Sequence, residues 1–369
     1  MDIGDIENNV EPLENEPIGH TMLRIGLAGI GFMGWIHYLA YKKAKGVKLT
    51  AVCSRDQKKL AGDWRGIQGN FGPPGEQVNL GGVKKYAEFE QLLADPEIDA
   101  VDLCLPPHLH AEATLAALAA GKHVFVEKPM GLTAAECDKM VKAAAKAKKQ
   151  LLVGHVLPLL PEYCFAYSHA QSGKYGKLLG GHFKRVISDP LWLKDFYDPD
   201  KVGGPLVDLH VHDAHFIRLL FGMPTAVTSQ GRLRGGVVEY CVSQFQFADR
   251  ELVVSSASGV INQQGRPFTH GYEIHFEKAT LTFDLAVLAG GALQIAPLTV
   301  FDAKGKATQP KLPAGDPMLA AFDAEIKEVV RSLTSGQPSA LLAGELARDA
   351  IVLCHKQTQA VKSGKPVKI

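Results

Sequence analysis

A short stretch in the second half of the chain holds several side chains that could exchange protons. Residues 203–215 read Gly-Gly-Pro-Leu-Val-Asp-Leu-His-Val-His-Asp-Ala-His. Asp208 and His212 are four positions apart, so on a helix they share one face. A histidine can take or give a proton near neutral pH, and a nearby carboxylate can bind a hydroxyl group or polarise the site. An isolated histidine on an amphipathic helix is usually a packed residue, but the Gly-Gly entry and the four-residue spacing favour a functional pair.

The same stretch offers potential metal ligands. His210, Asp213 and His215 lie beside the pair, and His182 lies on a strand expected in the same domain. Three or four such groups could bind a divalent metal ion. The spacing alone defines no ligand set, and a polar pocket without metal would use the same residues. We therefore expect no metal site.

A lysine at a strand end is the second chemical candidate. Residues 123–126 form an expected strand that ends in Glu127-Lys128-Pro129. Ligands of open α/β sheets bind beyond the carboxyl ends of the strands. There the Lys128 ammonium could donate to a substrate hydroxyl and stabilise a developing oxyanion. Taken without its context, the tripeptide would be interpreted as a surface loop.

The turn after the first expected strand has the pattern of a dinucleotide-binding turn. It reads Gly29-Ile-Gly31-Phe32-Met33-Gly34, a G-x-G-x-x-G motif that opens a helix. Gly29 permits the tight turn, Gly31 lets the backbone approach a pyrophosphate, and Gly34 lets the helix pack close to the strand. We expect this turn, including Phe32 and Met33, to bind NAD or NADP; a glycine-rich turn without a ligand is the alternative.

The choice between the two dinucleotides depends on the end of the second strand. The acid expected about 20 residues after the turn is replaced by Ser54, which is followed by Arg55 and Asp56. A hydroxyl and a guanidinium could bind a 2′-phosphate, which favours NADP. Asp56 could still reach the ribose, and Arg55 could be a solvated charge, so both cofactors stay open.

The chemical residues need a scaffold that brings strand ends together. Between residues 23 and 155, short apolar runs alternate with helical periods, which predicts a doubly wound parallel sheet. From about residue 177 to 301, extended runs follow one another with a single helix, at about 205–221, between them. This pattern predicts an α+β domain with an antiparallel sheet and helices on one face. Two more helices, at about 316–335 and 343–363, are expected to close the chain.

Two segments around the lysine resemble a known family. Residues 99–110 (DAVDLCLPPHLH) and 119–129 (AAGKHVFVEKP) are similar to the pattern of the glucose–fructose oxidoreductase / inositol 2-dehydrogenase (Gfo/Idh/MocA) family, which is a strand, P-x-x-x-H, a helix and A-G-K-H-V-x-x-E-K-P. The second family signature, G-G-x-x-x-D-x-x-x-H, matches Gly203, Gly204, Asp208 and His212. The resemblance extends from residue 23 to the C-terminus. It implies an N-terminal Rossmann domain, a C-terminal α+β domain with a large open, mostly antiparallel sheet, and oxidation or reduction of sugars, cyclitols and related polyols.

The resemblance also implies residue roles. Lys128 and His212 are the expected catalytic residues, with His212 as the general base, and Asp208 would bind a neighbouring hydroxyl. Pro106, His110, Glu127 and His155 are expected on the nicotinamide side of the crevice, and Lys128 and His155 next to both cofactor and substrate.

The chain departs from its relatives after the sixth strand, where many of them carry an arginine. Here the chain reads Gly154-His155-Val-Leu-Pro158, so an anionic substrate group is less expected. Lys184 is a further substrate-binding candidate, although a strand that leads into a loop would explain it equally well.

Three functional hypotheses follow. The first is an NAD(P)-dependent dehydrogenase that acts on a secondary hydroxyl of a sugar, glycoside or cyclitol. The second is a glycoside hydrolase or lyase that keeps its cofactor bound and uses transient oxidation. The third is a non-catalytic dinucleotide sensor, which would have no need of Lys128, Asp208 and His212.

Composition limits the remaining possibilities. The 369 residues carry a formal net charge of +1, and no apolar run reaches membrane-spanning length, so we expect neither a nucleic-acid nor a membrane partner. Six scattered cysteines form no C-x-x-C pair, which favours free thiols in the cytoplasm. We expect an acidic arm at 1–21, a dinucleotide-binding domain at 22–154, and a substrate-binding domain at 155–369 whose sheet forms a homodimer or homotetramer.

Overall fold

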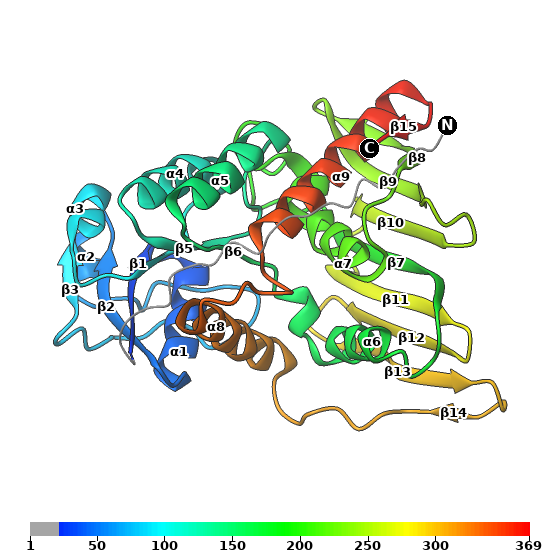
Figure 1. Cartoon of the computed structure of the whole chain (residues 1–369), viewed down its shortest axis with the longest axis horizontal. Helices are drawn as coiled ribbons and strands as arrows, with labels where there is room; N and C mark the ends of the chain where they lie inside the picture. The colour runs from blue at the N-terminus through cyan, green and yellow to red at the C-terminus, as the bar shows by residue number, and fades with distance from the viewer. Residues whose placement is uncertain (1–21) are drawn as a thin grey trace, which may run out of the picture.

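The computed structural model describes residues 22–369, which form a parallel sheet and a larger mixed sheet side by side (Figure 1). The acidic arm expected at residues 1–21 lies outside the described residues. None of the helices between residues 22 and 369 is long and apolar enough to cross a membrane.

The first sheet has six parallel strands in the order β3-β2-β1-β4-β5-β6, as the alternation of strands and helices predicted. Its strands are β1 (Leu23–Ala28), β2 (Val47–Cys53), β3 (Lys84–Tyr86), β4 (Ala100–Leu103), β5 (His123–Glu127) and β6 (Leu151–Gly154). Its helices are α1 (Phe32–Lys43), α2 (Gln57–Leu60), α3 (Phe89–Ala94), α4 (His110–Ala119) and α5 (Ala134–Ala147). The short α2 and β3 were not predicted, because four and three residues are too few to show a period.

The second sheet has nine strands in the order β14-β13-β12-β11-β7-β10-β9-β8-β15. They are β7 (Leu178–Ser188), β8 (Ala226–Arg234), β9 (Val237–Gln246), β10 (Val253–Ile261), β11 (Phe268–Phe276), β12 (Ala279–Val287), β13 (Leu293–Asp302), β14 (Ala307–Thr308) and β15 (Val367–Lys368). Neighbouring strands are antiparallel except β7 and β10, which are parallel. The mostly antiparallel sheet is therefore confirmed.

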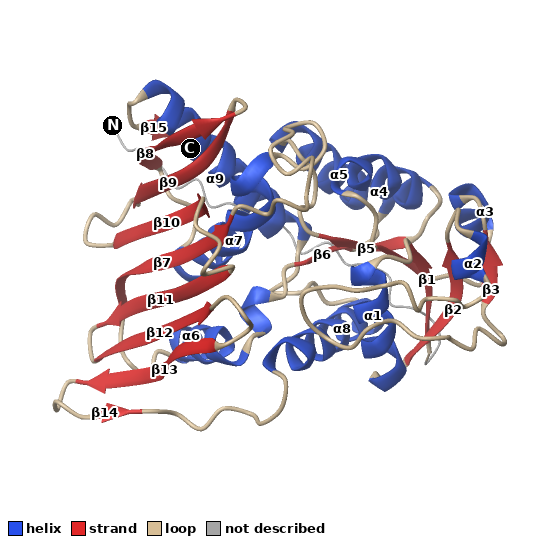
Figure 2. Cartoon of the chain, turned by 180° about the vertical axis from the view of Figure 1, so that it is seen from behind, coloured by secondary structure: helices blue, strands red, loops and turns tan. Residues whose placement is uncertain are grey.

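Helices cover one face of this nine-stranded sheet (Figure 2). They are α6 (Pro161–Ser172), α7 (Val211–Phe221) and α9 (Gly344–Ser363). The single helix expected at 205–221 is in fact two segments, because a π-helical turn (Leu206–His210) precedes α7. Such wider turns are frequent at functional sites.

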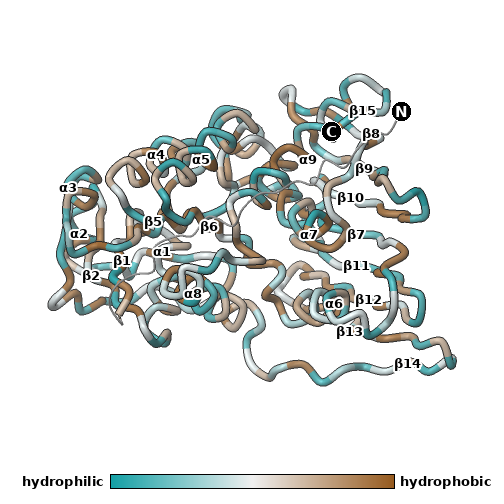
Figure 3. The backbone as a smooth tube through the Cα atoms, in the orientation of Figure 1, coloured by the Kyte–Doolittle hydropathy of each residue, from teal (hydrophilic) through white to brown (hydrophobic). Residues whose placement is uncertain are grey.

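The two C-terminal helices join the sheets. Helix α8 (Pro317–Ser335) packs on α1, and its Ile326, Val329 and Leu333 share a core with Leu23 and Ile25 of β1. Helix α9 packs against both α5 and α7. The turns of α5 and α8 alternate between hydrophilic and hydrophobic residues, as expected for helices with one buried face (Figure 3). The end of the chain thus stabilises both sheets.

Candidate active site

The glycine-rich turn follows β1 and opens α1, as its spacing predicted. Gly29 has a φ of 97°, and a Cβ there would lie 2.3 Å from the backbone oxygen of Cys104. A Cβ on Gly34 would lie 2.2 Å from the backbone oxygen of Gly29. Both glycines are therefore required by the fold itself.

Gly31 is different, because a Cβ there would meet no protein atom within 4 Å. Gly31 is the N-cap of α1, and no side chain caps the backbone N–H groups of this first turn, which includes Phe32 and Met33. Free N–H groups at a helix N-terminus favour an anion. The open space and the uncapped turn fit the pyrophosphate of a dinucleotide, which would be bound by backbone groups of residues 31–34.

The residues that follow β2 form the N-terminal cap of α2. The Asp56 carboxylate accepts hydrogen bonds from the backbone N–H groups of Lys58 and Lys59, so it caps α2. Its own backbone N–H donates to the Ser54 hydroxyl at 3.1 Å. Arg55 is exposed. Asp56 is therefore occupied as the cap of α2.

Lys128 connects the parallel sheet to the π-helical turn that precedes α7. It follows β5, and its Nζ donates to the backbone oxygen of Asp208 at 2.8 Å and to Asp208 Oδ1 at 3.1 Å. Both side chains remain partly exposed, at 23% and 28%. The π-helical turn presents both the carbonyl and the carboxylate of Asp208 to the lysine. The structure therefore brings together Lys128 and Asp208, which are 80 residues apart in the sequence.

Three histidines line the interior next to this contact. His155 follows β6, and its ring stacks on His215 at 4.1 Å between centroids and meets His212 edge-on at 6.0 Å. Both ring nitrogens of His155 and Nδ1 of His212 are buried without a hydrogen-bond partner among the described residues. Burial lowers the pKa of His212 well below its usual value, and the charges of Lys128 and Arg185 lower it further. His212 is thus a neutral imidazole with nitrogens available to a ligand.

His110 and Pro106 lie at the end of β4. The His110 ring is buried between the backbone oxygens of Pro129 and Leu105, at 2.7 and 2.8 Å. Burial lowers its pKa. His110 therefore connects the loops that follow β4 and β5, whereas Pro106 is exposed at the edge of the sheet.

Several candidates from the sequence lie away from this site. Arg185 of β7 forms a buried ion pair with Asp213 of α7, with Nε 2.7 Å from Oδ2. Because neighbouring residues of a strand point to opposite faces, Lys184 and His182 lie on the other face of the sheet. There Lys184 Nζ pairs with Asp284 at 2.7 Å, and His182 contacts the Ser255 hydroxyl. Within this chain, Lys184 is not brought together with Lys128 and His212.

The potential metal ligands around α7 do not form a cluster. The His210 ring contacts the Gln357 amide on α9, and Asp213 is occupied by Arg185. Among residues 22–369, the groups close enough to share a metal ion centre on His37 instead, with Asp102 and Cys104 or with Glu127 and Glu325.

His37, Asp102 and Glu325 were missed by the sequence analysis. His37 Nε2 lies 3.1 Å from Glu127 Oε1, across 90 residues of sequence. The sequence held one signal for a buried histidine: His37 comes three residues after Gly34, on a helix that must pack against the sheet.

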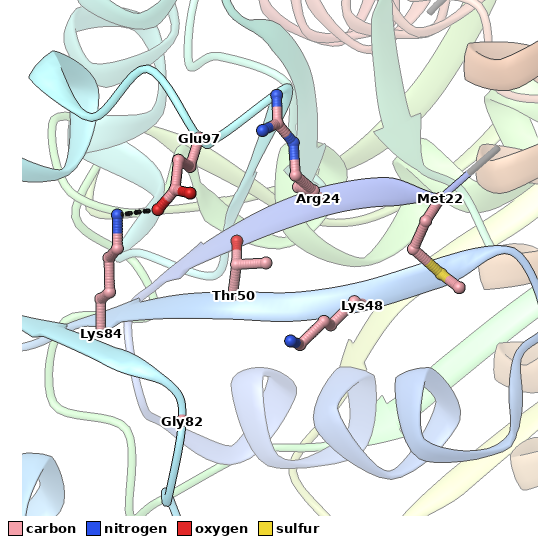
Figure 4. A pocket seen from close by; sticks show the side chains of 7 residues that line it. All are labelled: Met22, Arg24, Lys48, Thr50, Gly82, Lys84 and Glu97. Carbon is pink, nitrogen blue, oxygen red and sulfur yellow. Dashed lines mark ion pairs between the residues drawn. The ribbon is translucent and has the colours of Figure 1, made fainter. Parts of the chain in front are cut away.

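A surface cavity of about 500 Å³ lies elsewhere, beside the amino-terminal parts of β1 to β3 (Figure 4). Of its charged groups, Lys84 pairs with Glu97 and Arg24 pairs with Asp99, and Lys48 also lines the cavity. It is at the edge of the sheet opposite to the glycine-rich turn and is not part of the candidate site.

A glycine-rich turn at the carboxyl edge of a parallel sheet, together with a lysine at a strand end that contacts a helical segment covering a second sheet, is the arrangement of a dinucleotide-dependent oxidoreductase. The chain belongs to the Gfo/Idh/MocA family. Residues 23–155 match the model of the oxidoreductase family with NAD-binding Rossmann fold, and residues 166–282 match the GFO/IDH/MocA C-terminal domain. The resemblance seen in the sequence is thereby confirmed, as is an NAD-type cofactor.

Individual relatives are similar over most of the chain. The 1,5-anhydro-D-fructose reductase of Ensifer adhaerens is 29% identical over 271 residues, which is 70% of this chain and 76% of the relative. The myo-inositol 2-dehydrogenase of Thermotoga maritima is 26% identical over 362 residues, 94% of this chain and 98% of the relative. Levoglucosan dehydrogenase, solved with NADH and levoglucosan, shares the fold with a TM-score of 0.74 at 19% identity, over 94% of this chain and 99% of that one.

Proposed function

We propose that this protein is an NAD(P)-dependent dehydrogenase that transfers hydride between nicotinamide and a secondary hydroxyl or keto group of a sugar, glycoside or cyclitol. The observation that carries the proposal is the contact of Lys128 with Asp208 beside a half-buried, neutral His212. Relatives named for an anhydro sugar, an inositol and levoglucosan support the substrate class.

Each residue has a role in this reaction. Lys128 donates to the substrate oxygen and stabilises negative charge as it develops there. His212 takes the hydroxyl proton on a ring nitrogen, which is available because its lowered pKa keeps the ring neutral. Asp208 orients Lys128 and binds a neighbouring hydroxyl. A bound nicotinamide would supply the hydride acceptor, and Pro106, Glu127 and His155 are the residues that would hold it.

The charges around the site favour an uncharged substrate. The Arg185 guanidinium is paired with the Asp213 carboxylate, and Pro158 contributes no charge. The neutral imidazole of His155 can both donate to and accept from hydroxyl groups. For the cofactor, exposed Arg55 next to Ser54 supports acceptance of NADP in addition to NAD.

The test is a panel of sugars, glycosides and cyclitols with NAD and NADP, followed by nicotinamide absorbance and by product analysis. We expect Lys128→Ala and His212→Ala each to lose turnover by about 10²-fold or more while they still bind cofactor. His169→Ala on α6 is the matched control, because this histidine contacts Phe165 and Lys174 and lies outside the site.

Three results would contradict the proposal. Near-normal turnover in Lys128→Ala or His212→Ala would contradict the catalytic role assigned to that residue. Release of a sugar without net reduction of the cofactor would indicate the redox-assisted glycosidase. Cofactor binding without turnover on any polyol would indicate the sensor.

We also propose that the open face of the nine-stranded sheet forms a homodimer or homotetramer. Val242, Val253 and Phe301 lie on the face away from α7, and they are 48%, 65% and 44% exposed. Exposed apolar groups on one sheet face are typical of an interface. Val253→Glu should shift the protein toward the monomer in sedimentation velocity, and an unchanged sedimentation coefficient would argue against this face.

A further inference from the structure

A buried polar cluster lies under the strand end that carries Lys128. Its centre is His37 of α1, which is fully buried. His37 Nδ1 lies 2.9 Å from Asp102 Oδ2, and Nε2 lies 3.1 Å from Glu127 Oε1. An imidazole with a carboxylate at each nitrogen can satisfy both only by donating from both. Burial by itself lowers the pKa of His37, but the charge and hydrogen bond of Asp102, together with the contact to Cys104, outweigh it and raise the pKa well above its usual value.

The cluster is connected to Lys128 through Glu127. Glu127 Oε2 accepts a hydrogen bond from the backbone N–H of Lys128 at 3.0 Å, while Oε1 faces His37. The Phe125 ring stacks on His37, with centroids 5.2 Å apart, and holds its orientation. The Tyr41 hydroxyl donates to Asp102 at 2.9 Å. Every group between Asp102 and the Lys128 backbone therefore has a defined partner.

Glu325 closes the cluster from α8. It is fully buried, and neither carboxylate oxygen has a hydrogen-bond partner among the described residues. Ligand atoms of His37, Glu127 and Glu325 all lie within 4.8 Å of one another. Burial raises the pKa of Glu325 well above its usual value, and the nearby Glu127 charge raises it further. An ionised, unpartnered carboxylate at this depth would be strongly destabilising, so Glu325 is the neutral acid.

With Glu325 neutral, the cluster keeps one net negative charge. The titratable groups that face the cluster are His37, Tyr41, Asp102, Cys104, Glu127 and Glu325. Burial raises the pKa of both Tyr41 and Cys104, so these two are neutral. One imidazolium lies between two carboxylates, and no imidazole nitrogen has a free lone pair for a metal ion.

We propose that His37 and Glu325 are positioning residues for Lys128: the His37 imidazolium holds Glu127, Glu127 holds the Lys128 backbone, and the neutral acid of Glu325 closes the cluster from α8. The inference rests on the proposed catalytic role of Lys128. It assigns a function to α8, which places the Glu325 side chain beside His37 and Glu127. Neither residue touches substrate or cofactor.

The first test is a double-mutant cycle with His37→Asn, Glu127→Gln and the combination. Each single variant should lower kcat on the order of tenfold or more, because small displacements of a catalytic group are costly. The double variant should be no slower than the slower single variant, since both act through one chain of contacts. The substrate KM should change by less than about twofold in all three. Losses that multiply, or a loss confined to KM, would overturn the proposal.

The second test uses Glu325 and stays informative if His37→Asn does not fold. Glutamine has the shape of the neutral acid, so Glu325→Gln should keep most of the kcat that Glu325→Ala loses. The thermal stability of Glu325→Gln should equal that of the unmodified protein. Glu325→Gln as slow as Glu325→Ala would show that a charge is needed and overturn the neutral assignment. One equivalent of tightly bound metal in the purified protein, lost in Glu325→Gln, would also overturn it.

Lys128→Ala measured alongside separates the two proposals. Normal turnover of His37→Asn together with a slow Lys128→Ala overturns only the positioning role. Normal turnover of Lys128→Ala overturns the catalytic role of the lysine itself. Nitrogen NMR shifts of His37 at pH 8 need no substrate: both nitrogens should be protonated, and a neutral ring would overturn the inference.

Discussion

Replacement of Gly31 by alanine should separate cofactor binding from folding. Gly31 is the middle glycine of the turn, with φ −103° and ψ −160°, a conformation that alanine adopts without strain. A Cβ there meets no protein atom within 4 Å, so the folded chain accommodates the methyl group. That same space is where a pyrophosphate would approach the first turn of α1. The methyl group should therefore interfere with the ligand and not with the protein.

The expected magnitude follows from the contacts at risk. A hydrogen bond to a charged group contributes about 1.5–3 kcal/mol. Displacing the pyrophosphate from one backbone N–H should weaken cofactor binding by roughly 10- to 100-fold. The stability of the cofactor-free protein should change by less than about 1 kcal/mol.

Gly34→Ala is the matched comparison within the same turn. Its Cβ would lie 2.2 Å from the Gly29 backbone oxygen, so the fold must distort. Such overpacking typically costs about 1–3 kcal/mol. Calorimetric titration with NAD and NADP, together with urea unfolding of the cofactor-free proteins, measures both quantities. Unchanged cofactor affinity in Gly31→Ala, or a loss of stability as large as in Gly34→Ala, would refute this reasoning.

Two further predictions concern stability. Arg185→Ala leaves the Asp213 carboxylate buried without its partner and should cost about 3–5 kcal/mol in urea unfolding. Arg65→Ala breaks a surface ion pair with Asp63 and should have no measurable effect. The pKa of buried His215 is lowered to about 3, mainly by burial, while the unfolded chain titrates near 6.5. Its contribution to stability is therefore complete above pH 6.5 and is lost as the pH falls toward 3. His215→Gln should reduce the pH dependence of the unfolding free energy below pH 6 by up to about 1.4 kcal/mol per pH unit, and an unchanged slope would contradict the burial argument.

Local features of the sequence determined most of the secondary structure. The capping box of Thr133 and Glu136 starts α5, since Glu136 N–H donates to the Thr133 hydroxyl at 3.1 Å. The same holds for the glycine turn, because its steric requirement involves only a strand, a turn and the helix after it. The π-helical turn was not predictable in this way. Its Asp208 carbonyl accepts from Lys128, and no nearby sequence signal encodes that contact.

The sequence by itself therefore determined the two sheets, the dinucleotide turn and the identity of Lys128, Asp208 and His212 as candidates, because each depends on short-range pattern. Only the tertiary structure decided which candidates meet. It separated Lys184 from the site, since strand alternation turns it to the opposite face from Arg185. It also placed His37 against Asp102 and Glu127, which lie 65 and 90 residues away in the chain. Contacts at such separations depend on how sheets and helices pack, and that information is spread over the whole sequence.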